Sequence, residues 1–249
     1  MNEVSRRAFN QGTLGSLLTF SLLESLFAGD AFAAKIKPVA ANWLASLNQT
    51  SQELKGKKLS QLQWQGKVEE LFKEVNLPDL LKFVDFDKLT ANLKFRDKGE
   101  LSLRAKFPEV EGLPTKLVFG HQTFALKKDR SVVPHGHNNM ATAFLVLKGT
   151  FEGKHYDRLE DEAKHFIIKP TIDSTFTVGQ YSTVSDHKDN IHWFKATSDR
   201  GYIFNIHVLN VVEGKGSGRV YLDPKGEPIS GGRIRARKIR AAEAYKLYG

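Results

Sequence analysis

The chain has 249 residues, of which 41% are hydrophobic and 10% aromatic, so it can bury a sizeable core within one main domain. It carries 37 basic and 28 acidic residues, a formal net charge of +9, and no cysteine. The missing cysteine excludes disulfides, a cysteine nucleophile, cysteine-held zinc and iron–sulfur clusters, so any metal must be held by histidine or carboxylate. No run of about 20 apolar residues predicts a membrane span.

Residues 1–33 have the order of an export signal. The stretch SRRAF at 5–9 precedes a modestly apolar run over 13–23, and Ala31 and Ala33 then give the small-x-small pattern of a cleavage site. The arginine pair resembles the twin-arginine signal of bacteria, which implies cleavage after Ala33 and a periplasmic location. The alternative is an amphipathic N-terminal helix with two surface arginines.

Residues 34–98 are predicted to form a helical region that packs on the rest of the fold. Apolar residues recur there at helical spacing, as in GKVEELFKEV over 66–75, and Pro78 starts the next helical segment. No linker rich in Pro, Gly or Ser separates this region from the remainder of the chain, so we expect one packed unit.

Residues 99–249 change to a period of two. Short segments such as ELSLRAKF, KLVFGHQTFAL and YIFNIHVLNV are rich in Phe, Val, Ile and Thr and are separated by polar turns. Seven or more such strands within about 115 residues favour an all-β fold, an antiparallel sandwich or small barrel.

The C-terminal end of the chain is strongly basic. Residues 215–249 hold nine basic and three acidic residues. Within RIRARKIR the charges alternate with Ile and Ala at strand period, and no aromatic residue interleaves them as a stacking platform for single-stranded nucleic acid requires. We therefore expect a solvated strand edge or a packing contact, and no nucleic-acid partner.

Two histidines two residues apart are the main functional signal. In VVPHGHNNM, His135 and His137 project to the same face if the segment is a strand. A metal needs at least one more ligand, and His192, at the start of an aromatic strand, is the candidate. The alternatives are imidazoles on a polar turn for the pair, and a core histidine bonded to a carbonyl for His192.

The residues around these histidines resemble the cupin family. The first cupin motif is an H-x-H pair followed by a glutamate and then by a glycine that turns the strand; Thr142 stands at about the glutamate position. Among cupins without the glutamate, the thiol dioxygenases of the plant cysteine oxidase and 2-aminoethanethiol dioxygenase type are most similar. The matching residues are His135, His137, Met140, Gly149, Tyr156-Asp157 and NIHWFKA from Asn190 to Ala196.

The resemblance implies a jelly-roll barrel over residues 99–249 that carries the basic C-terminal extension. It also implies non-haem Fe(II) on His135, His137 and His192, and oxidation of a small thiol to a sulfinate with O2. The sequence departs from the group where an aspartate facing the iron is expected, because His207 stands there. A histidine at that place can act as a pocket acid or base, or add a fourth ligand.

Other functions fit the same residues. Three histidines also suit Zn(II) or another divalent metal, which would indicate a hydrolase or isomerase that needs no O2. A non-catalytic cupin that binds a small ligand is the other alternative. The four remaining histidines, His121, His155, His165 and His187, are expected at the surface or behind the site, and the oligomeric state stays open.

Overall fold

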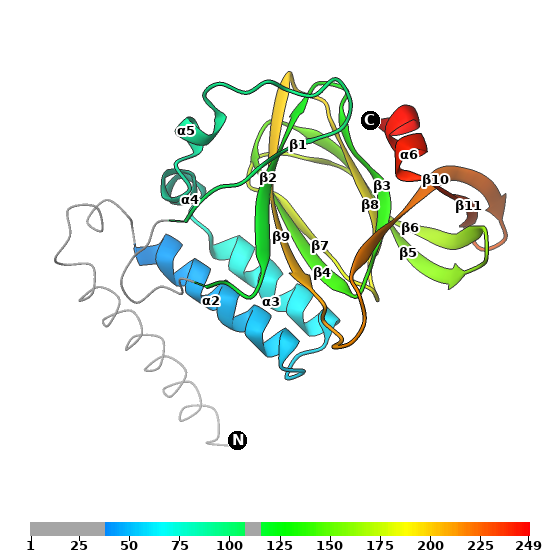
Figure 1. Cartoon of the computed structure of the whole chain (residues 1–249), viewed down its shortest axis with the longest axis horizontal. Helices are drawn as coiled ribbons and strands as arrows, with labels where there is room; N and C mark the ends of the chain where they lie inside the picture. The colour runs from blue at the N-terminus through cyan, green and yellow to red at the C-terminus, as the bar shows by residue number, and fades with distance from the viewer. Residues whose placement is uncertain (1–37, 108–115) are drawn as a thin grey trace, which may run out of the picture.

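A computed structural model describes residues 38–107 and 116–249 (Figure 1). The predicted export signal, residues 1–33, lies outside the described residues. The described chain forms two antiparallel β-sheets, with the N-terminal helices on one side and the C-terminal helix on the other (Figure 1). Within it, none of the helices combines the length and the apolar character that crossing a membrane requires.

The first sheet has five strands in the order β1-β2-β9-β4-β7. Its strands are β1 (Leu101–Leu103), β2 (Gly120–Lys127), β9 (Arg200–Leu209), β4 (Met140–Lys148) and β7 (Tyr181–Val184). The second sheet closes on itself in the order β10-β11-β6-β5-β8-β3. Its strands are β10 (Gly218–Ile229), β11 (Arg233–Ile239), β6 (His165–Phe176), β5 (Phe151–Asp161), β8 (Ile191–Ala196) and β3 (Ser131–Asn138). The antiparallel barrel with an added helical region, predicted from the sequence, is confirmed.

The helices α2 (Pro38–Lys55), α3 (Gln61–Glu74), α4 (Leu77–Phe83) and α5 (Phe86–Thr90) precede the strands, and α6 (Ala241–Tyr248) ends the chain. Helix α3 begins with a capping box, in which Ser60 accepts from the amide of Gln63 while the Gln63 side chain accepts from the amide of Ser60. The helix packs on β4 and β7 of the five-stranded sheet (Figure 1). Helices α2–α5 therefore cover the outer face of that sheet, whereas α6 lies against β3 and β10 of the other sheet.

Strand β4 is buried on both faces, and its two faces serve different cores. Ala143 and Leu145 point to the helices, where they join Trp64 and Phe72 of α3. Phe144, on the other face, joins the aromatic cluster between the two sheets. Thr142 shares the face of Phe144 because the side-chain period of a strand is two, so the space between the sheets continues from this cluster toward the histidines.

The basic segment RIRARK forms β11, which pairs with β10 on one side and β6 on the other. It is therefore not a strand edge, and the alternative of a packing contact describes it. Its cations are neutralised by carboxylates: Arg235 lies 2.9 Å from Glu162, and Arg237 lies 2.7 Å from Glu243. Lys238 also forms a close ion pair with Asp161.

Candidate metal centre

Strand β3 carries His135 and His137 into the space between the sheets. The β3–β8 register shifts between Val132 and His135, and Pro134, which has no amide hydrogen for a ladder, lies within this irregularity. The carbonyl of Val133 is then free to accept from His135 Nδ1 at 2.7 Å. Both imidazoles are buried, with 1% and 2% of each residue exposed. The pair therefore lies on a buried strand, and the alternative of a polar turn with exposed imidazoles is wrong.

His192 reaches the same space from the neighbouring strand, β8, where it is the register partner of His135. Asn190 fixes its approach: the Asn190 amide donates to the carbonyls of His137 and Ser185, each at 2.8 Å. Gly136 makes room for this amide, since a Cβ at that position would lie 2.7 Å from Asn190 Oδ1. The glycine between the two histidines thus lets Asn190 tie β8 to β3.

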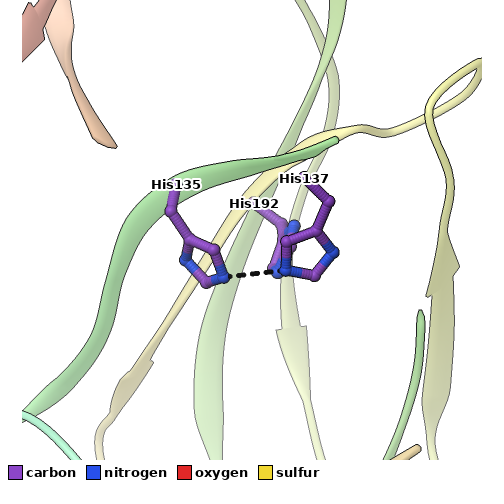
Figure 2. Close-up of side chains that lie close together, drawn as sticks. All are labelled: His135, His137 and His192. Atoms are coloured by element: carbon purple, nitrogen blue, oxygen red, sulfur yellow. Dashed lines mark hydrogen bonds between the residues drawn. The ribbon is translucent and has the colours of Figure 1, made fainter. Parts of the chain in front are cut away.

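The three imidazoles point toward one another (Figure 2). One nitrogen from each of His135, His137 and His192 lies within 4.8 Å of the other two. The Nε2 atoms of His135 and His137 are 3.1 Å apart. Two nitrogens on one metal at bond lengths of about 2.1 Å are separated by about 3.0–3.4 Å, so this spacing fits two ligands of a single ion.

Hydrogen bonds define which ring nitrogens carry lone pairs. His135 Nδ1 bonds the Val133 carbonyl, and His192 Nδ1 bonds the Asn190 carbonyl at 3.1 Å. A carbonyl only accepts, so Nδ1 holds the hydrogen in both neutral rings and Nε2 holds a lone pair. His192 Nε2 is buried and has no partner among the described residues. An unpartnered buried acceptor is costly, and a metal ion would satisfy it.

Thr142 contacts His137 rather than standing in as a ligand. Its Oγ1 lies 3.1 Å from His137 Nδ1. A hydroxyl both donates and accepts, so Thr142 is compatible with either tautomer of this ring. In one tautomer of His137, Nε2 carries the hydrogen and donates to His135 Nε2. In the other, which a metal would select, Nδ1 carries the hydrogen and donates to Thr142 Oγ1, so that Nε2 would be free to bind the metal. Thr142 thus orients His137 and, as a neutral hydroxyl, adds no charge to the cluster.

Burial keeps the three rings neutral, which is the form that binds metals. It lowers the pKa of His135 to about 3, with a further lowering by the charge of Arg219. The pKa values of His137 and His192 lie well below the usual value because of burial first, and then because of the neighbouring histidines.

A cavity of about 700 Å³ opens beside His135 and His137. His207, on β9, lines it as the sequence suggested. Gly120, its register partner on β2, leaves space for this ring, since a Cβ there would lie 2.2 Å from His207 Nε2. Burial, with a smaller effect of Arg219, lowers the pKa of His207 to about 4, so this ring is neutral at pH 7.

Other residues of the motif hold the strands that carry the ligands. Gly149 has φ +86° between β4 and β5, and a Cβ there would lie 2.5 Å from the Arg200 carbonyl, so the turn requires glycine. The Asp157 carboxylate accepts from the Asp189 amide at 2.8 Å, just before the strand of His192. Met140 lines the cavity.

His155, expected at the surface or behind the site, is fully buried. It pairs with His192 across β5 and β8, and its ring stacks on Phe176. Its Nδ1 has no partner among the described residues. Burial lowers the pKa of His155 to about 3. The only local signal was its place on a strand beside Lys154, which does not reveal burial.

His155→Leu should make the metal-free protein more resistant to acid. The folded pKa of about 3 lies below the ordinary 6.5, so the unfolded chain alone binds this proton between the two values, and stability falls as the pH falls through that window. Without the His155 imidazole, the free energy of unfolding should fall less steeply with decreasing pH. The difference in slope should be about 1.4 kcal/mol per pH unit at pH values well below 6.5. Denaturant unfolding at pH 7.5 and 5.5, with chelator, measures this.

Phe176→Leu is the matched control, because it changes the same buried cluster without a titrating group. Its effect on the free energy of unfolding should be equal at the two pH values. An unchanged pH slope in His155→Leu would contradict a buried neutral imidazole.

No family model and no curated protein matches this chain. Solved structures are similar over part of it. Procruciferin, an 11S globulin from Brassica napus, is 12% identical, with a TM-score of 0.31 and coverage of 41% of this chain and 22% of that one. The 11S allergen from Cocos nucifera is 14% identical, with a TM-score of 0.30 and coverage of 41% and 24%. The vicilin from Solanum melongena is 12% identical, with a TM-score of 0.33 and coverage of 43% and 27%.

The match thus spans less than a third of each of those chains. The fold rests on the strand pairing of this chain, and the site rests on its own geometry. What the described residues establish is an antiparallel barrel in which three neutral, buried histidines form a possible metal site beside a cavity.

Proposed function

We propose that His135, His137 and His192 bind one Fe(II) ion and that the protein uses O2 to oxidise a small thiol to a sulfinate. The observation that carries the metal site is the convergence of one nitrogen from each of three buried rings, while Nε2 of His192 has no partner among the described residues. The ligand set alone suits zinc as well as iron. The choice of iron and thiol rests on the sequence resemblance around Gly149, Asp157 and Asn190.

When bound, Fe(II) would supply open coordination positions at which a thiolate and O2 react. His207 lines the cavity beside His135 and His137, and we assign it the contact with the thiol. The Asn205 side-chain oxygen lies 3.4 Å from His207 Nδ1 and accepts from Gln122 Nε2 at 3.2 Å. Nδ1 therefore carries the hydrogen and Nε2 is the acceptor. With its pKa lowered to about 4, the ring is neutral at pH 7 and can accept a hydrogen bond from the thiol, but it is too weak a base to hold the proton.

The aromatic cluster limits water behind the site. Phe144 packs on His192 with ring centroids 5.0 Å apart, and Phe194 packs on Phe144 at 5.1 Å. The overall reaction consumes one thiol and one O2, and both oxygen atoms enter the sulfinate. No other co-reactant is required.

Protein purified without chelator should contain about one iron per chain and consume O2 when a thiol is added, in a one-to-one ratio with the sulfinate formed. Elemental analysis, an oxygen electrode and mass spectrometry of the product measure these quantities. Iron-loaded protein that consumes no O2 with any thiol would contradict the reaction. Stoichiometric zinc that resists exchange for iron would instead favour hydrolysis or isomerisation.

A further inference from the structure

The cavity beside the histidines is lined by cations and by no carboxylate among the described residues. Arg104, Lys116 and Arg219 lie on its wall, together with polar groups such as Gln122 and Asn205. Its volume of about 700 Å³ suits a small organic molecule. All charged side chains on the described wall of the cavity are therefore positive.

These cations differ in their pairing from the basic residues of β11. Arg104 and Lys116 are exposed, and within the described chain neither has a hydrogen bond or an ion pair. Arg219 has one distant carboxylate neighbour, Glu100, at 3.7 Å. By contrast, Arg235 and Arg237 of β11 each hold a carboxylate at 2.9 Å or less. Within the described residues, the cations at the cavity are thus less closely paired than those of β11.

Arg219 directs its charge at the histidines. It is the register partner of His137 in the β10–β3 pair, so the two side chains share a face of the sheet. Arg219, His135, His137 and His207 also line the same cavity. Neutral ligands would leave the charge of a divalent metal uncompensated, because Thr142 supplies no anion. The site and its wall therefore attract negative charge.

We propose that the cavity binds a small anionic ligand, whose thiolate faces the three histidines and whose carboxylate is held by Arg104, Lys116 and Arg219. The position of the ligand's thiolate rests on the proposed function. The binding of its carboxylate rests on the residues of the cavity alone. An Arg or Lys bond to a carboxylate is charge-assisted and stronger than a bond to a neutral amide. The carboxylate should therefore dominate selectivity.

The test compares 3-mercaptopropionate with its isosteric amide, 3-mercaptopropionamide, on the full chain loaded with Co(II). Because the chain has no cysteine, any thiolate-to-cobalt absorption band arises from the probe. We expect the acid to bind at least about tenfold more tightly than the amide. Arg104→Gln and Lys116→Gln, both at exposed unpaired residues, should each reduce this ratio without unfolding the protein, and Arg219→Gln should reduce it most.

Arg235→Gln is the matched control, because it removes a paired arginine outside the cavity and should leave the ratio unchanged. Equal affinity for acid and amide in the wild type, or a ratio that none of the three cavity variants alters, would overturn the anion inference and leave the metal site intact. Failure to bind Co(II) would instead contradict the proposed function. Calorimetry would then measure the binding of propionate to the metal-free protein. Binding that is lost in Arg219→Gln would support the anion site, and an absence of binding would overturn it.

Discussion

His192→Ala should abolish stoichiometric metal binding. The variant should fall from about one metal per chain to below about a tenth, because two histidines remain where three neutral nitrogens converge. It should also lose the stabilisation that bound metal supplies, which is about 2.7 kcal/mol at a free metal concentration one hundred times Kd. Elemental analysis and thermal unfolding with and without added metal measure both effects.

His165→Ala is the matched control, since it removes a partly exposed imidazole on β6 that forms no part of the cluster. It should retain metal and the metal-dependent rise in Tm. In chelator, His192→Ala should itself lose some stability, because a fully buried ring and its bond to the Asn190 carbonyl are removed, so the rise in Tm on adding metal is the quantity compared. If His192→Ala kept its metal and its activity, the three-histidine site would be refuted. If the protein is instead a non-catalytic ligand-binding protein, the same substitution should cost only some stability.

Trp64→Ala should destabilise the whole protein by about 3–5 kcal/mol, as expected for a buried tryptophan replaced by alanine. Trp64 of α3 is 0% exposed, shares a core with Phe204 of β9, and donates from Nε1 to Ser51 Oγ at 3.3 Å. Its removal leaves a cavity between helices and sheet. Denaturant unfolding followed by both far-UV circular dichroism and tryptophan fluorescence gives the free energy.

The control on the same helix is Leu62→Ala, whose side chain is half exposed, and whose substitution should change stability by less than about 0.5 kcal/mol. Trp64→Ala should unfold in one transition with a lower midpoint. Two separate transitions would show that the helices fold independently of the sheets, contrary to the expectation that residues 34–98 pack as part of one unit.

The sequence was sufficient for the barrel and for the three converging histidines. Strands are recognised by a period of two, and His135 and His137 had to share a face once VPHGHN was assigned to a strand. The pairing that adds His192 joins strands that lie far apart in the sequence, so the residues alone offered His192 only as a candidate, and the family resemblance supported the choice. The spacing of side chains along one strand can be seen in the local sequence, whereas the identity of the strand that pairs with it cannot.

His155 and the C-terminal strand show what local pattern does not reveal. His155 lies beside Lys154 in a segment with charged residues, yet the β5–β8 pairing buries it behind His192. RIRARK has the composition of an exposed edge, yet β11 pairs on both sides, and carboxylates from distant positions, such as Glu162, neutralise its charge. In both cases the deciding partner comes from a distant part of the chain.

The cavity draws its walls from both sheets, and this division has a consequence for how the protein can change. All three histidines belong to β3 and β8, whereas Gln122, Asn205 and His207 belong to β2 and β9 of the other sheet. The cavity wall on β2 and β9 can therefore change without moving the histidine cluster on β3 and β8. The scaffold thus separates the shape of the cavity from the possible metal site.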